Sequence, residues 1–221
     1  MKNKIYLLIV AGGLGFPVLS VADATDAPSR FALGVKAGTL GAGFEGTFGI
    51  SERFNVRAGI NNYSRKFEDT ESDIRYDATL DLKNAGVFLD WHPFAGTFRL
   101  SAGLINNRNG IHLSATPTAN QQIGSTTYTP AQIGTLTGDV TFKKNAPYLG
   151  IGWGNAVNKG SPFGFNFELG VAKQGSPKVK LTSSNSTVSQ SDLDSEARSA
   201  ETDLGDFKSY PVISLGLSYR F

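Results

Sequence analysis

The chain contains no cysteine, so it can form neither disulfide bonds nor thiolate metal sites. It has only two histidines, His92 and His112, and they are isolated rather than grouped as metal ligands. The 221 residues carry 21 basic and 19 acidic side chains, and so even a balance gives no support for nucleic-acid binding. From these absences we expect no metal, no cofactor and no nucleic-acid partner.

Long apolar runs are also missing, except for one short stretch near the start, Ile5–Ala11. It is far shorter than the roughly 20 apolar residues of a membrane-spanning helix. Two lysines precede it and small residues follow it, an order typical of a secretory signal peptide. We therefore predict a signal peptide at residues 1–24, cleaved after Ala22 or Ala24, and a single domain at residues 25–221.

What the chain does have is alternation of apolar with polar or small residues. In its last strand Ile213, Leu215 and Leu217 alternate with Ser214 and Gly216. Further segments of this kind begin near residues 31, 44, 54, 78, 98, 148 and 163. Alternation over about ten residues is typical of strands that cross a membrane in a closed barrel. The pattern predicts an all-β fold, an eight-stranded antiparallel up-and-down transmembrane β-barrel.

The connections between these segments alternate in length. Those near Ser51, His92 and Asn155 are short, which is typical of the periplasmic side. Longer polar stretches, which we expect to be solvated outer loops, lie at residues 66–73, 114–138 and 182–205; the outer turn at Thr39–Leu40 is the one short exception. The apolar alternation shifts by one residue at Lys83–Asn84, which predicts a β-bulge.

A soluble barrel with its apolar face turned inward is the main structural alternative. Glycines such as Gly59, Gly103 and Gly150 recur on the polar face, where they would weaken a strand facing water. Small residues are needed inside a narrow eight-stranded barrel. The glycines therefore favour the membrane barrel.

Charges of both signs lie on the predicted inner face. The expected lumen network comprises Lys36, Glu45, Arg57, Asp81, Lys83, Asp90, Arg99, Glu168 and Arg220. Because an unpaired charge away from water is costly, these groups should pair and close the interior. The alternative is a narrow polar conduit whose charges select small solutes.

Aromatic residues gather near the short turns. We expect an interfacial girdle of Phe54, Trp91, Phe94, Trp153 and Phe163. The chain resembles the small bacterial outer-membrane β-barrel proteins, the architecture of the OmpA-type, OmpW-type and opacity-type barrels, in its leader, its alternating strands and its terminal aromatic. The resemblance implies an assembly signal at Leu215, Leu217, Tyr219 and Phe221.

Some outer-membrane barrels are lipid-modifying enzymes, which makes hydrolysis a further hypothesis. His112 and Ser114 share one strand face, but no acidic residue occurs between Asp90 and Asp139 to orient the histidine locally. We therefore predict no catalytic residues.

The expected function is that of an integral outer-membrane protein with a structural, surface-interaction or minor permeability role. A narrow channel for small solutes is the alternative, and a lipid A-modifying enzyme is the third hypothesis. Expected partners are outer-membrane lipid and lipopolysaccharide, with the barrel assembly machinery and periplasmic chaperones during biogenesis. We expect a monomer in the cell outer membrane.

Overall fold

The computed structural model describes residues 30–71, 74–158 and 160–221. The predicted signal peptide at residues 1–24, with its cleavage site, lies outside these ranges. Within them, no helix combines the length and apolar character needed to span a membrane.

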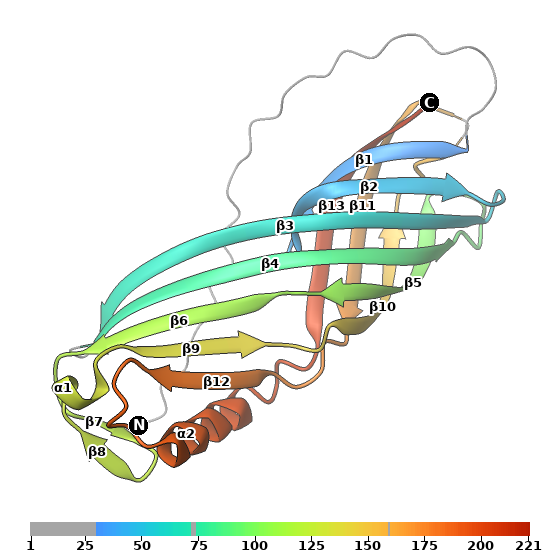
Figure 1. Ribbon diagram of the computed structural model, residues 1–221. Helices are drawn as coiled ribbons and strands as arrows, with labels where there is room; N and C mark the ends of the chain where they lie inside the picture. Colours follow the sequence, from blue (N-terminus) through green and yellow to red (C-terminus); the bar gives the residue numbers. More distant parts are fainter. Residues whose placement is uncertain (1–29, 72–73, 159) are drawn as a thin grey trace.

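Eight antiparallel strands form a ring, closed by pairing of the first with the last (Figure 1). In order around the ring they are β1 (Phe31–Gly38), β2 (Gly41–Gly49), β3 (Phe54–Glu71), β4 (Ile74–Trp91), β5 (Phe98–Asn107), β10 (Asn145–Trp153), β11 (Phe163–Ala172) and β13 (Tyr210–Arg220). Sequential strands are neighbours throughout, which is the predicted up-and-down order.

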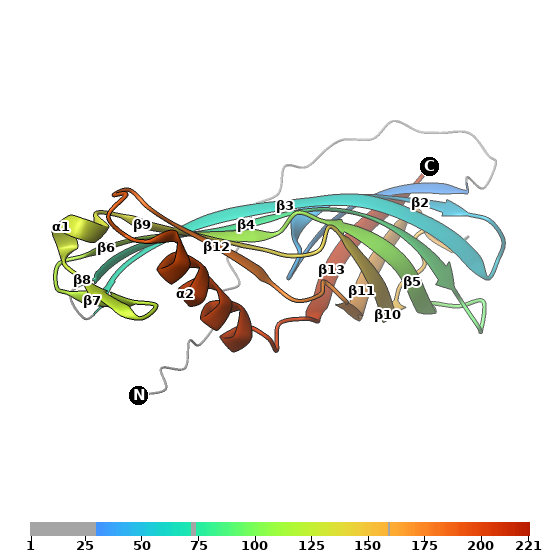
Figure 2. The same cartoon turned by 60° about the horizontal axis from the view of Figure 1, so that its bottom comes forward.

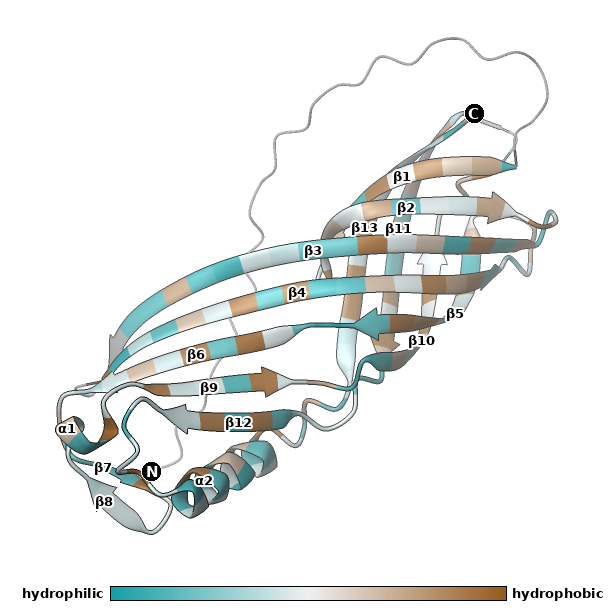
Figure 3. Cartoon of the chain, in the orientation of Figure 1, coloured by the Kyte–Doolittle hydropathy of each residue, from teal (hydrophilic) through white to brown (hydrophobic). Residues whose placement is uncertain are grey.

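Alternation explains why these segments form the ring. Along β13, Ile213, Leu215 and Leu217 are exposed on the outer surface, whereas Val212 and Ser218 are buried inside. The same banding of apolar and polar residues runs along the neighbouring strands (Figure 3). The apolar face therefore points outward, opposite to the arrangement of a soluble barrel.

The ring is not a simple barrel, because its sheet continues beyond one end. There β6 (Gly110–Pro117), β9 (Leu136–Thr141) and β12 (Lys178–Ser183) join the outer halves of β4 and β3 in the order β12-β9-β6-β4-β3. A hairpin of β7 (Gln121–Ile123) and β8 (Thr126–Tyr128) and two helices, α1 (Pro130–Ile133) and α2 (Gln190–Asp203), complete this part. We call the five-stranded sheet and these elements the head (Figures 1 and 2).

The head has its own apolar core. Its buried members are Ile123, Tyr128, Ile133, Val188 and Leu193, and Leu136 and Leu181 of the sheet pack against them. The stretches at residues 66–73, 114–138 and 182–205, expected to be solvated loops, thus include strands and helices among their described residues. The expectation of solvated loops was wrong because apolar side chains of these segments pack against one another and form the core of the head.

Asp192, at the start of α2, joins the helix to the β7–β8 hairpin. Its Oδ2 accepts hydrogen bonds from Tyr128 Oη (2.7 Å) and Ser189 Oγ (2.9 Å), and its Oδ1 accepts one from Ser125 N (3.2 Å). These bonds, that from Tyr128 foremost, hold the pKa of the Asp192 carboxyl well below its usual range. The carboxylate thus ties the hairpin to the helix.

The predicted bulge at Lys83–Asn84 is absent. Strands β3 and β4 pair in unbroken register from Phe54↔Trp91 to Glu71↔Ile74. Leu82 lies on the same inner face as Asn84, and both are buried. The apolar residues change faces here because β4 passes from the ring, where its outward face is apolar, into the head, where its inward face is covered. The shift in the apolar alternation at Lys83–Asn84 therefore reflects a change in the surroundings of β4, without a bulge.

Candidate functional site

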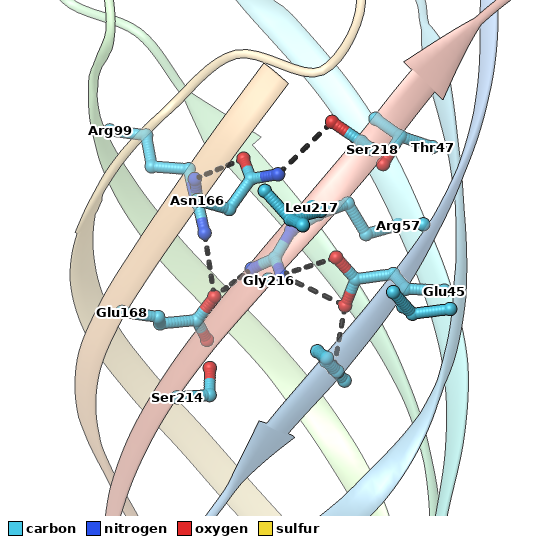
Figure 4. A pocket seen from close by; sticks show the side chains of 13 residues that line it. Glu45, Thr47, Arg57, Arg99, Asn166, Glu168, Ser214, Gly216, Leu217 and Ser218 are labelled. Atoms are coloured by element: carbon cyan, nitrogen blue, oxygen red, sulfur yellow. Dashed lines mark hydrogen bonds and ion pairs between the residues drawn. The ribbon is translucent and has the colours of Figure 1, made fainter. Parts of the chain in front are cut away.

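The interior of the ring is organised around Arg57, which β3 directs inward (Figure 4). Its Nε and Nη2 donate to Asp90 (2.5 and 3.0 Å), and its Nη1 donates to both oxygens of Glu45 (3.1 and 3.0 Å). Its Nη2 also lies 2.8 Å from Glu168 Oε2. Arg57 therefore contacts three carboxylates from three different strands.

Two further cations complete the cluster. Arg99 Nη2 donates to Glu168 Oε2 (2.8 Å), and Lys36 Nζ donates to Glu45 Oε2 (2.6 Å). Three cations thus meet three carboxylates, and their side chains are all at least 86% buried by accessible surface. We call Lys36, Glu45, Arg57, Asp90, Arg99 and Glu168 the ion cluster. Its formal charge is zero, as burial requires.

Two aromatic side chains fill the space beside the ion cluster. Tyr148 donates its hydroxyl to Glu168, and its ring meets Phe88 edge-on at 5.1 Å between centroids. The Arg57 guanidinium lies over the same Phe88 ring at 5.1 Å. Glycine gives Tyr148 its room, because a Cβ at Gly150 or Gly170 would overlap its hydroxyl.

Phe88 and Tyr148 were not among the residues predicted from sequence, although both fall on the polar face of their strands. The signal that could have identified them is a large aromatic among glycines on an otherwise small, polar face. Such a residue has space inside a narrow barrel only where its neighbours are small.

Two small cavities lie beside the ion cluster. One cavity of about 20 Å³ lies beside Arg57, Arg99 and Ser218, and a second of about 10 Å³ lies beside Phe88 and Tyr148. Lys36, Glu168 and Ser214 line both cavities, so they separate them. A single water needs about 10–15 Å³. Each cavity thus has space for roughly one water.

The short-turn end is filled as well. Asn55 Nδ2 donates to His92 Nε2 (3.1 Å) and to Asn155 Oδ1 (3.1 Å), and His92 Nδ1 lies 2.9 Å from Gly96 O. Arg99 Nη1 donates to Gly154 O (2.8 Å). Gly154 and Asn155, which follow β10, thereby contact side chains of β5 and β3 at this end of the ring.

Three residues of the predicted network lie away from the ion cluster. Lys83 and Asp81 are on the outward face of β4, where Lys83 Nζ lies 3.7 Å from Asp81 Oδ1 and the lysine side chain is 57% exposed. Their assignment to the lumen is corrected, since it depended on the bulge that is absent. Arg220 lies on the inner face of β13, near its end and opposite Ala32.

The predicted girdle residues are all exposed on the short-turn side of the ring. Phe54 and Trp91 are direct neighbours across β3 and β4, and Trp153 stacks on Phe167 (5.9 Å). Phe94 and Phe163 are the most exposed, at 79% and 71%. Aromatic side chains therefore surround this end of the ring.

The residues of the expected assembly signal lie along the seam between β1 and β13. Leu215, Leu217 and Tyr219 pair with β1, and Phe221 packs against Tyr219 (5.3 Å) and Phe31 (6.2 Å). The terminal aromatic therefore contacts both strands that close the ring.

His112 has a carboxylate partner on another strand, although no acidic residue lies near it in the sequence. It lies opposite Asp139 on β9, and its Nδ1 is hydrogen-bonded to that carboxylate. However, its Nε2 lies 3.9 Å from Asp81 Oδ2, and Ser114 stands opposite Asp77 and Thr137 in the ladder. The histidine is thus held between two carboxylates on the outward face of the head.

Solved structures with the same fold are known. The crystal structure of Acinetobacter baumannii CarO2 matches at a TM-score of 0.59 and 22% identity, covering 87% of this chain and 99% of that one. The crystal structure of Acinetobacter baumannii CarO matches at a TM-score of 0.57 and 23% identity, covering 86% and 97%. No family model matches the chain, and no curated protein sequence matches it. The likeness therefore supports the β-barrel fold of the chain.

Proposed function

We propose that this chain is an integral outer-membrane β-barrel protein with a closed interior, which holds the head outside the membrane for a structural or surface-interaction role. The observation that carries the proposal is the inversion of polarity between the two faces of the ring. Large apolar side chains such as Phe44, Leu149 and Phe165 are 60–69% exposed outside, while charges are buried inside. Lipid, rather than water, suits such an outer surface.

The partners that follow are outer-membrane lipid and lipopolysaccharide around the ring, with the assembly machinery and chaperones acting during biogenesis. A leader removed on export would deliver the chain to them. With the short turns in the periplasm, the head projects from the cell surface, where it is accessible to other molecules.

Single cysteines test this orientation, because the chain has none of its own. We expect a membrane-impermeant maleimide to label Ser199→Cys, on an exposed position of α2, in intact cells. The matched variant Gly160→Cys, in the short connection before β11, should react only after the outer membrane is opened. The reverse labelling pattern would contradict the orientation, and labelling of both in intact cells would contradict the barrel.

Conductance separates the closed barrel from the channel alternative. The two cavities beside Arg57 and Tyr148 are the observation that favours a channel, since a solute path would have to connect them. We expect the folded protein to be silent in a planar bilayer, with heat-dependent gel mobility showing that the barrel is formed. Discrete current steps that change on Glu168→Gln would instead support a conduit through the ion cluster.

A further inference from the structure

Three exposed cations lie where the ring meets the head. Each stands in a connection at the head end of a ring strand: Arg108 follows β5, Lys143 precedes β10 and Lys173 follows β11. The strands β5, β10 and β11 are neighbours in the ring (Figure 1). By strand parity the three residues continue the outward-facing columns of these strands. We call Arg108, Lys143 and Lys173 the cation row.

The height of the cation row matches the far boundary of a membrane. Each of its residues is ten positions along the strand from an aromatic residue of the short-turn end, namely Phe98, Trp153 or Phe163. Ten residues span about 34 Å along a strand, or about 26 Å along the barrel axis at a tilt of about 40°. The apolar band of an outer-membrane barrel is about 25 Å tall. The row therefore lies at the level of the lipid headgroups on the head side.

Arg108 and Lys143 are opposed at the ends of β5 and β10. The two strands pair in register as far as Asn106↔Asn145, and a further backbone hydrogen bond extends this register by one step. The next opposed residues are the two cations. Like charges opposed in this way destabilise a strand pair. A shared anion would remove that cost.

Lys173 joins these two cations from the neighbouring strand. The Lys143 side chain packs over Gly175, where an added Cβ would lie 2.7 Å from Lys143 Cδ, so it reaches the chain two residues beyond Lys173. Among the residues that the structure describes, no member of the cation row forms an ion pair with a carboxylate. Lys83 on β4, by contrast, has a carboxylate oxygen 3.7 Å from its Nζ.

The cation row is confined to one side of the ring. The side opposite β5 and β10 is formed by β1 and β2. These two strands are joined at the head end by the turn Thr39–Leu40, which carries no charge. Charges that serve solubility are normally interspersed with charges of the opposite sign. The row therefore favours an anionic partner bound on that side.

The surface between the cation row and the short-turn end is apolar. Leu104, Leu149 and Val171 are 62%, 69% and 49% exposed on the outward faces of β5, β10 and β11. A ligand that fits both surfaces has acyl chains along the strands and phosphate groups at their head ends. Lipopolysaccharide has this chemistry, because its lipid A part carries phosphates directly above its acyl chains.

We propose that the cation row binds the lipid A phosphates of one lipopolysaccharide molecule, whose acyl chains lie along β5, β10 and β11. The inference rests on the proposed function, in which the head side of the ring lies in the outer leaflet. Arg108 can hold a phosphate through two parallel N–H groups, and the two lysines act as point charges beside it. The bound phosphates offset the repulsion within the row.

Ligand binding to the folded protein, extracted from outer membranes in detergent, tests the proposal. The probe is purified lipopolysaccharide, titrated against the protein by native mass spectrometry. The row variant carries Arg108→Gln, Lys143→Gln and Lys173→Gln. We expect its affinity to fall roughly a hundredfold, from about fivefold per cation. The matched control removes three exposed cations of the head, by Lys66→Gln, Lys180→Gln and Arg198→Gln.

Unchanged affinity in the row variant, or an equal loss in the control, would overturn the proposal. Heat-dependent gel mobility of each variant shows that a loss of binding does not reflect unfolding. Two further probes are lipopolysaccharide without its lipid A phosphates and phosphatidylglycerol. Both should bind the unsubstituted protein more weakly. If the dephosphorylated probe binds equally well, the row does not recognise phosphate; if phosphatidylglycerol does, the ligand is not lipopolysaccharide.

The binding test and the cysteine-labelling test can fail separately. Affinity in detergent does not depend on which way the protein points in the membrane. A reversed labelling pattern with normal binding would therefore contradict the proposed function alone. The expected labelling pattern with equal binding by the row variant would contradict the lipopolysaccharide site alone.

Discussion

Arg57 on β3 and Glu168 on β11 form an ion pair of 2.8 Å between strands that stand opposite each other in the ring. Four steps separate these strands in either direction around the ring, so the pair crosses its full width. A contact of this kind fixes the diameter of the ring from within, and Glu45 and Asp90 hold the arginine from its two neighbouring strands.

We expect Arg57→Met to lower the free energy of unfolding by about 3–5 kcal/mol, because it leaves three carboxylates buried without their shared cation. The measurement is urea unfolding followed by heat-dependent gel mobility. Arg75→Met is the control, since Arg75 is 64% exposed and its ion pairs are 3.6 and 4.0 Å long. Such pairs contribute about 0–1 kcal/mol. Equal effects would show that the buried cluster does not stabilise the ring.

Gly170→Val should destabilise the ring by about 1–3 kcal/mol, because the new side chain would displace Tyr148 from its hydrogen bond to Glu168. The same change at Gly160, which has nothing within 4 Å of its Cβ position, should have little effect. Unfolding midpoints in urea check both variants. A neutral Gly170→Val would mean that Tyr148 can move without cost.

Asp192→Asn should release the β7–β8 hairpin from α2 at neutral pH, measured as faster amide hydrogen exchange in residues 121–128. The folded-state pKa of Asp192 lies below its usual value of 3.8, so its contribution is fully present above that pH. The contribution declines as the pH falls below 3.8 and is lost below the folded-state pKa. The unsubstituted hairpin should therefore stay protected at pH 5.

The control for the hairpin is Asp194→Asn, two residues along the same helix. Asp194 is exposed and accepts its hydrogen bond from Gln190 within the helix. Exchange in the hairpin should be unchanged in this variant. Faster exchange in both variants would point to a general loss of helix stability instead.

Phe221→Ser should reduce the amount of folded protein in the outer membrane, because Phe221 packs on Tyr219 and Phe31 where the ring closes. Phe94→Ser removes another exposed aromatic of the same end, which contacts Phe98 (6.3 Å), and should have a smaller effect. Quantitative immunoblots of membrane fractions measure both. Normal levels of the Phe221 variant would count against a terminal assembly signal.

The sequence predicted the ring well, because every ring strand has one face toward an apolar surface and one toward a narrow polar interior. The alternation of Phe163, Phe165 and Phe167 with small or polar residues was enough to predict β11. The tight turn at Thr39–Leu40 was equally clear. The residues of the ion cluster could be predicted because they lie on the polar face of their strands. Which charges meet depends on the register between strands, and no local pattern contains that register.

The head was missed for a physical reason. Its helix α2 buries only Leu193 and Ala197 among its apolar residues, so its helical periodicity is weak. Its capping Ser189 is one of many serines in the segment. At Lys83 the two surroundings of β4 meet, and a rule that assumes one apolar face per strand must then infer a bulge. Knowledge of where the ring ends along β4 would have removed that error.

The seam between β1 and β13 has a kinetic consequence. It joins residues 32–38 to residues 214–220, and closing so long a chain segment costs more entropy than forming any of the hairpins. Long-range pairings of this kind form slowly. Until they form, both strands are open edges with apolar outer faces, at risk of aggregation in water. The head, whose pairings are more local, can fold before the ring is complete.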